Sequence, residues 1–274
     1  MIKTITSLYF DGKDKGIILD NAYDLHIRNQ FSKYIKENSI NYLRCQDTDI
    51  NLLTFFPNVE FITLPEDAEN IEGLYNLKKL RGLEISSRNL EKLDLFCFSD
   101  LEYLIISDYS KEHSYKLQSC KQLKHICIIH SDISSLESVA INSELESLHL
   151  EFCYNLKKLD GIQSFKGLKR LILDYCLKLE NVSVLCSLAD SINYLRITDC
   201  NKIQGLIDVL SKLTEIKTLY LSTSQTSKVN NLRSVGFVKK LTKLEDFMTN
   251  YKIEDGDLAP LLNVKQVDVL RFYK

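Results

Sequence analysis

The fold is decided by residues 144–179, which read ELESLHLEFCYNLKKLDGIQSFKGLKRLILDYCLKL. This stretch contains the pattern L-x-x-L-x-L-x-x-C-x-x-L twice, and the second copy begins 23 residues after the first. The apolar and thiol positions of the two copies are Leu145, Leu148, Leu150, Cys153 and Leu156, then Leu168, Leu171, Leu173, Cys176 and Leu179. Self-similarity at a fixed period of about 20 to 50 residues is typical of stacked repeats.

In each copy, the segment L-x-L predicts a short strand, because successive side chains of a strand point to opposite faces. One unit cannot bury its own apolar side, so neighbouring units stack and their strands form a parallel sheet. Cys153 and Cys176 stand where the chain leaves the strand, and there a small thiol can contact backbone groups of the turn. The spacing is that of a leucine-rich repeat. We predict an α/β repeat solenoid with a parallel sheet on the concave face and short 3₁₀, α or extended segments on the convex face.

The pattern continues on both sides of this stretch. The middle leucine of each unit marks thirteen candidate strands, at Leu8, Leu25, Leu43, Ile62, Leu83, Leu104, Ile126, Leu148, Leu171, Leu195, Leu219, Phe247 and Val267. Apolar residues three apart between the strands, as in 71–83, predict 3₁₀-like outer turns. The longest unit follows Leu219 and predicts a loop and a short helix within 222–240. One continuous array predicts a single domain over 1–274, with degenerate cap repeats in 1–39, regular repeats in 40–221 and irregular repeats in 222–274.

Bulk composition narrows the class of protein. A net charge of −2 gives no strong global field and argues against a general nucleic-acid or membrane binder. The chain shows no secretory start and no run near the roughly 18 apolar residues that cross a bilayer. The eight cysteines form no C-x-x-C pair. Cys153, Cys176 and Cys200 occupy the same place in successive repeats and Cys45 falls on a core leucine position, which indicates small buried residues. We therefore expect a cytoplasmic protein without disulfides, metal or cofactor.

From these motifs the chain resembles bacterial leucine-rich-repeat proteins of the short-repeat, internalin-like kind, with cysteine-type central repeats. The resemblance covers nearly the whole chain and is specific from Leu80 to Leu221. It implies an arc-shaped scaffold that binds proteins, and it names no partner. Unlike internalins, the chain shows no export signal and no surface-anchoring segment.

Alternation along each strand predicts which side chains face the concavity. Tyrosine, arginine and histidine recur there and lysine does not, which is the bias of a protein interface. Eleven carboxylates oppose five arginines on this face, a balance of about −6 against −2 for the whole chain. An acidic wall attracts a basic protein and repels nucleic acid. The predicted partner-binding residues are Tyr103, His125, His149, Glu151, Arg170, Asp174, Tyr175, Tyr194, Arg196, Asp199 and Tyr220.

Three functions remain open at this stage. The first is a non-enzymatic scaffold that docks a basic protein, with a bacterial toxin-neutralising immunity protein as one specific role. The second is a self-assembling structural or host-directed interaction protein, including a homodimer through the C-terminal edge. The third is a metal-dependent or Cys/His enzyme that uses the cluster His125, Cys127 and His149. We favour the first, because the chain has no phosphate-binding glycine loop, no H-E-x-x-H and no G-x-S-x-G motif.

Overall fold

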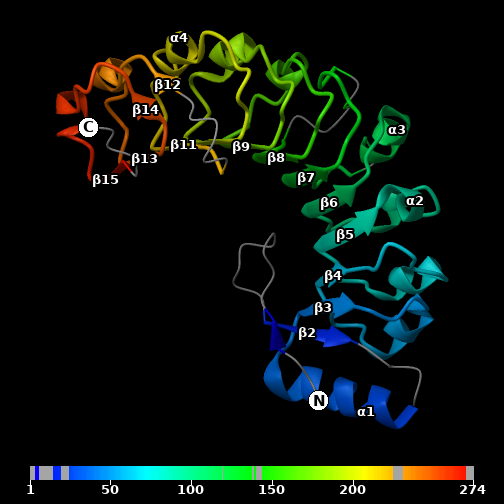
Figure 1. Cartoon of the computed structure of the whole chain (residues 1–274). Helices are drawn as coiled ribbons and strands as arrows, with labels where there is room; N and C mark the ends of the chain where they lie inside the picture. Colours follow the sequence, from blue (N-terminus) through cyan, green and yellow to red (C-terminus); the bar gives the residue numbers. More distant parts are fainter. Residues whose placement is uncertain are drawn as a thin grey trace. The chain divides into compact units, whose positions relative to one another are not determined.

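The computed structural model describes residues 4–5, 15–19, 25–118, 120–137, 139, 144–224 and 231–269. The chain divides into two compact units, which we call unit 1, up to Cys127, and unit 2, from Ile128 onward. In each unit short strands line one side and 3₁₀ or short α-helical turns line the other (Figure 1). The border between the units falls inside strand β7 (His125–Ile129).

Unit 1 begins with a short antiparallel strand pair and continues with parallel strands in chain order. Its strands are β1 (Thr4–Ile5), β2 (Gly16–Leu19), β3 (Tyr42–Cys45), β4 (Phe61–Thr63), β5 (Gly82–Ser86) and β6 (Tyr103–Ser107). Its helices are α1 (Leu25–Asn38), α2 (Ser87–Leu90) and α3 (Ser114–Leu117), with 3₁₀ turns at Ile50–Phe55, Ile71–Asn76, Leu95–Cys97 and Lys111–His113. The predicted 3₁₀-like outer turns are therefore confirmed.

Unit 2 also consists of parallel strands with outer turns, and it has a second, two-stranded sheet at its side. Its main strands are β8 (Ser147–Glu151), β9 (Arg170–Asp174), β10 (Tyr194–Thr198), β11 (Thr218–Ser222), β13 (Asp246–Thr249) and β15 (Gln266–Val269). The side pair is β12 (Asn231–Leu232) with β14 (Lys252–Ile253). The outer turns are α4 (Leu206–Leu210) and the 3₁₀ turns Ile162–Ser164, Ser183–Leu188, Gly236–Lys240 and Ala259–Leu261.

The repeat register follows the leucine markers. In unit 2, Leu148 lies opposite Leu171, which lies opposite Leu195, and the next pairings join Leu195 to Leu219 and Leu219 to Phe247. All five side chains are 0% exposed. Full burial of one such side chain contributes about 1.5 to 3 kcal/mol, so this stacked column is a large part of what stabilises unit 2. The predicted solenoid with a parallel sheet is confirmed.

The predicted strand at Leu25 is wrong, because Leu25 is the first residue of helix α1. Phe31 and Ile35 lie four residues apart in α1 and are each 7% exposed. This spacing puts both on one face of a helix, where they are buried. Arg28 lies on this helix as well, so no strand carries it.

The strand that pairs with β3 comes earlier in the chain than predicted. Ile17 in β2 lies opposite Leu43 and is fully buried. The run Gly16–Leu19 contains two adjacent isoleucines, and β-branched side chains pack well on a half-buried pleated surface. The candidate strand at Leu8 lies outside the described residues.

The cysteines behave as the repeat pattern predicts. Cys153, Cys176 and Cys200 are at most 3% exposed, and all eight cysteines of the chain are free thiols. Each of the three sulfurs contacts two backbone carbonyl oxygens where its strand ends; for Cys176 these belong to Leu150 and Asp174, both at 3.7 Å. The thiols therefore supply weak second donors to carbonyls of the turn; the Asp174 carbonyl, for example, also accepts a hydrogen bond from the Phe152 amide at 3.0 Å.

Candidate functional site

The sheet face of unit 2 is the set of side chains on β8 to β13 that point away from the leucine column. Strands β8, β10 and β11 alternate between buried and partly exposed residues along their whole length. Alternate side chains of parallel strands in register line up across the sheet. The predicted residues Arg170, Tyr194, Arg196 and Tyr220 therefore lie on one surface.

An ion network centred on Asp174 crosses three strands of this face. His149 Nε2 donates to the Asp174 carboxylate at 3.0 Å. Arg196 donates to the same carboxylate from Nε at 3.2 Å and through a second, shorter bond from Nη2. Glu151 Oε2 lies 3.9 Å from the same His149 Nε2. Four of the predicted residues are thus brought together, and they bind one another.

The network fixes the charge of Asp174. Burial alone would raise the pKa of Asp174, but the hydrogen bonds from His149 and Arg196 hold that pKa below its usual value. Asp174 is only 5% exposed, so its carboxylate mainly serves to orient the two bases beside it. Removing one partner of a buried ion pair is strongly destabilising, because the remaining charge is left without compensation.

We expect Asp174→Asn to lower the free energy of unfolding by about 2 to 3 kcal/mol, because a partly buried Arg196 loses its partner. A carboxyl group whose pKa is depressed in the folded protein stabilises the fold when the pH is above the pKa that the group has in the unfolded chain, near 4. That contribution is lost as the pH falls through the folded pKa. Urea unfolding between pH 3 and 7 measures both effects.

The matched control for this prediction is Asp190→Asn, since Asp190 is exposed on the outer side of unit 2. Surface changes of this kind stay within about 0.5 kcal/mol. If the two variants lose equal stability, or if Asp174→Asn keeps the acid sensitivity of the wild type, the network does not stabilise unit 2.

Aromatic side chains continue the face toward β13. The Arg170 guanidinium stacks over the Tyr194 ring at 3.6 Å, and Tyr194 meets Tyr220 edge to face at 5.8 Å. Tyr220 in turn donates its hydroxyl proton to Asp246. That hydrogen bond raises the pKa of Tyr220 to about 12. Because each ring is already held by a neighbouring side chain, the two tyrosines lose little conformational entropy when a partner binds to them.

A second row of rings lies where the strands end. His130 stacks on Phe152 with ring centroids 4.9 Å apart, and Phe152 stacks on Tyr175 at 4.7 Å. All three residues have left-handed backbones, with φ of 53°, 54° and 56°. This conformation is uncommon for residues other than glycine and costs about 1 to 2 kcal/mol each. The chain thus has partly exposed rings at positions where glycine would adopt the left-handed backbone without this cost.

Of this ring row, only Tyr175 was among the predicted partner-binding residues. The signal that would have revealed the other two is their spacing, since His130, Phe152 and Tyr175 follow one another at intervals of 22 and 23 residues. They occupy the same position in successive units, directly after the strand. Equal positions in stacked repeats lie side by side.

Asp199 holds the corresponding position in the next unit, and its environment differs. It is 0% exposed and accepts hydrogen bonds from Thr223 Oγ1 at 2.7 Å and from the Ser224 backbone at 3.0 Å. Its carboxylate joins two consecutive turns. We therefore leave Asp199 out of the surface offered to a partner.

The remaining predicted residues belong to unit 1. Tyr103 stacks on His125 with ring centroids 4.2 Å apart, and it also meets Phe61 edge to face at 5.9 Å. Phe61 and Tyr103 are two strands apart and both pair with Gly82, which has no side chain to separate them. His125 and Cys127 lie in unit 1 and His149 in unit 2, so the metal or Cys/His cluster stays a sequence hypothesis.

No protein-family model matches the chain, and no curated protein matches it. Solved structures do. The receptor TLR13, in a complex with the RNA ssRNA13, matches with a TM-score of 0.50 at 15% identity, over 87% of this chain and 41% of that one. The chain has the leucine-rich-repeat fold. This likeness shows the fold alone.

Other leucine-rich-repeat structures similar to this chain are internalins of Listeria monocytogenes, as the sequence resemblance predicts. Internalin C2 matches with a TM-score of 0.48 at 17% identity, over 79% of this chain and 83% of that one. The functional domain of InlJ, described as including a cysteine ladder, matches with a TM-score of 0.46 at 15% identity, over 82% and 56%. Among the described residues, no helix has the length and apolar character to cross a membrane.

Proposed function

We propose that the protein is a non-enzymatic scaffold whose sheet face of unit 2 binds a protein partner. The observation that carries this proposal is the Arg170–Tyr194 stack at 3.6 Å, at the start of β9 and β10. The ring row of His130, Phe152 and Tyr175 adds aromatic side chains at the other end of the strands. Arginine and tyrosine are the residue types in which binding energy concentrates at protein interfaces. Rings held in one orientation before binding are the pre-organised anchors that such interfaces use.

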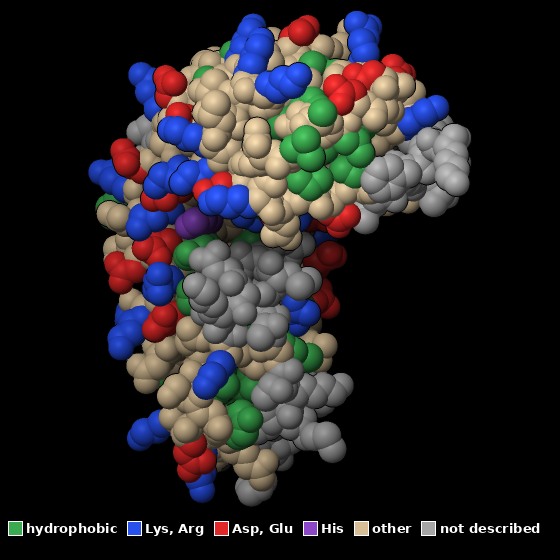
Figure 2. Space-filling view, turned by 90° about the vertical axis from the view of Figure 1, so that its left-hand side faces the viewer, with side chains coloured by type: hydrophobic (Ala, Val, Ile, Leu, Met, Phe, Trp, Pro, Cys, Tyr) green, Lys and Arg blue, Asp and Glu red, His purple; other side chains and the backbone are tan. Residues whose placement is uncertain are grey.

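The partner that fits this face is basic. On β8 to β13, the sheet face of unit 2 carries three carboxylates, Glu151, Asp174 and Asp246, against two arginines and no lysine. Lys, Arg, Asp and Glu side chains are interspersed over the part of the surface seen in Figure 2. A local acidic surface steers a basic protein into contact. A cytoplasmic bacterial immunity protein that covers a basic toxin is the specific role consistent with this chemistry.

Affinity capture from native cytosol tests the proposal. The wild type retains a basic protein, and Arg170→Ala/Tyr194→Ala retains less than about a tenth as much, because two interface anchors of about 2 kcal/mol each are removed. Arg170 is exposed and Tyr194 is partly exposed, so both changes leave the leucine column intact. Quantitative mass spectrometry of the retained proteins gives the ratio.

The matched control is Arg88→Ala/Tyr115→Ala, which removes the same two side-chain types from α2 and α3. It retains the partner as the wild type does. Equal retention by both double variants contradicts the proposal, and a partner with an acidic contact surface contradicts the basic specificity. Capture of this chain alone points instead to self-association through β15. Leu262 and Val267 are 83% and 41% exposed at that end of unit 2, where hydrophobic side chains gather in Figure 2.

A further inference from the structure

A ladder of backbone hydrogen bonds runs along the side of unit 2, away from the main sheet. The Lys157 amide donates to Ser134 at 3.1 Å, Glu180 donates to Lys157 at 3.0 Å, and Gln204 donates to Glu180 at 2.9 Å. Each step joins equivalent positions of successive repeats. The ladder resumes in the side pair β12–β14, where Glu254 donates to Leu232 at 2.9 Å.

Between Gln204 and β12 the ladder is interrupted. Among the described residues, no backbone hydrogen bond joins 203–205 to 231–233. The repeat between them is the longest of the chain, with 28 residues from Leu219 to Phe247, and its β12 does not continue the ladder from Gln204. The interruption leaves a sheet edge on β12, and such an edge is a template for pairing with another strand.

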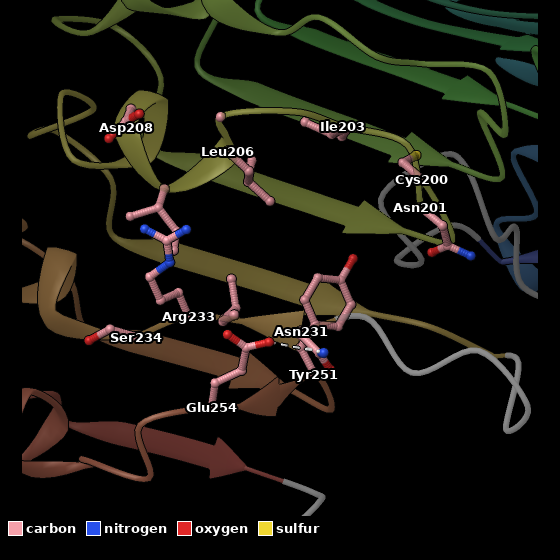
Figure 3. A pocket seen from close by; sticks show the side chains of 13 residues that line it. Cys200, Asn201, Ile203, Leu206, Asp208, Asn231, Arg233, Ser234, Tyr251 and Glu254 are labelled. Atoms are coloured by element: carbon pink, nitrogen blue, oxygen red, sulfur yellow. Dashed lines mark hydrogen bonds between the residues drawn. The ribbon is translucent and has the colours of Figure 1, made fainter.

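A cavity of about 600 Å³ lies at this interruption (Figure 3). Its volume falls within the range of about 300 to 1,000 Å³ that ligand pockets have. The apolar part of its lining comes from Ile203 and Leu206 on one side and Leu232 and Tyr251 on the other. Gly205 also lines it, and a Cβ at Gly205 would meet nothing within 4 Å. The space is thus open next to the backbone itself.

Charged side chains stand at both sides of this cavity. Arg233 follows β12 directly and extends toward α4, which carries Asp208 (Figure 3). Within the described part of the chain, the Arg233 guanidinium has no hydrogen-bond or ion-pair partner. Glu254, by contrast, already accepts a hydrogen bond from Asn231 at 3.1 Å. A ligand therefore meets one unpaired cation beside an apolar wall.

We propose that this cavity binds an extended peptide segment, which lies between Gln204 and β12 as an added strand. In strand addition the peptide pairs with the open edge of β12 through main-chain hydrogen bonds, and alternate side chains of the peptide enter the cavity. The apolar lining takes an apolar side chain, and Arg233 takes an acidic one through a bidentate pair. The proposal is independent of the sheet face, because none of its residues belongs to the sheet-face surface.

Selection of displayed random heptapeptides on the full-length protein tests this site, with counter-selection on the Arg233→Glu variant. We expect the retained peptides to share an acidic residue next to alternating apolar ones. Fluorescence anisotropy measures the affinity for the selected peptide. We expect Arg233→Glu to weaken this affinity by at least about tenfold, because the attraction between Arg233 and the acidic residue of the peptide becomes a repulsion. Arg88→Glu on α2 makes the same charge change at another exposed arginine and leaves affinity unchanged.

A second measurement distinguishes strand addition from side-chain binding alone. N-methylation of alternate backbone amides in the selected peptide removes its donors on one edge and abolishes binding if the peptide is an added strand. The proposal is overturned if no peptide is enriched over the counter-selection, if Arg233→Glu and Arg88→Glu bind equally well, or if no set of N-methyl groups weakens binding. Thermal melts of both variants confirm that they fold.

Discussion

Gly161→Ala is expected to lower the free energy of unfolding by about 3 kcal/mol. Gly161 has a φ of +104°, and a Cβ there would stand 2.4 Å from the Leu136 carbonyl carbon and 2.5 Å from the Glu137 nitrogen. The left-handed backbone costs about 1 to 2 kcal/mol for alanine. Overlap with another segment's backbone adds about 1 to 3 kcal/mol, because main-chain atoms cannot turn aside as a flexible side chain does. Urea unfolding measures the sum.

Gly205→Ala separates the two causes. Gly205 also has a positive φ, +63°, but a Cβ at this position meets nothing within 4 Å. Only the backbone cost remains, so we expect a loss of about 1 kcal/mol. Equal losses in the two variants would show that the outer turn at Gly161 does not pack against residues 136–137 as the structure has it.

Asp199→Ala is expected to cost about 3 to 4 kcal/mol. The Asp199 carboxylate accepts bonds from the hydroxyls of Thr223 and Ser224 and from the Ser224 amide. Removing it takes away the carboxylate that accepts from the Thr223 hydroxyl at 2.7 Å, in a residue that is only 3% exposed. Breaking a hydrogen bond to a buried polar group costs about 1 to 3 kcal/mol. Asp199 also has a φ of 52°, a conformation that aspartate tolerates better than alanine.

Asp190→Ala is the control for Asp199, and we expect it to change stability by less than about 0.5 kcal/mol. Asp199→Asn keeps one acceptor oxygen and should lose less than Asp199→Ala. Chemical denaturation of the three variants at neutral pH ranks them. If Asp199→Ala is no worse than Asp190→Ala, the carboxylate does not join the two turns.

The middle of the fold follows from the sequence because strand periodicity and equal spacing determine the register. The pairing of Leu148 with Leu171 and the burial of Cys153 and Cys176 need no other information. Helix α1 was missed because Leu25 suits the start of an amphipathic helix as well as the centre of a strand. Local pattern alone cannot separate the two over so few residues.

The sequence predicts which residues lie on the candidate surface, but it does not predict which of their side chains pair with one another. Alternation places Asp174 and Tyr194 toward the sheet face, but it does not say that Asp174 is engaged by His149 and Arg196. Such pairing depends on side-chain rotamers across three strands. The interrupted side ladder is likewise hidden: the length of the unit after Leu219 reveals an insertion, but not where its backbone leaves the ladder.

Hydroxyl-radical footprinting of the protein alone and in complex with its captured partner tests most directly whether the sheet face of unit 2 is the recognition surface. Oxidation of Phe152, Tyr175 and Tyr194 should slow on binding. Phe96 and Tyr115, which are 72% and 65% exposed on the outer turns of unit 1, should react as before and serve as internal controls. Slower oxidation of Phe96 and Tyr115, with Phe152, Tyr175 and Tyr194 unchanged, would contradict a binding role for the sheet face.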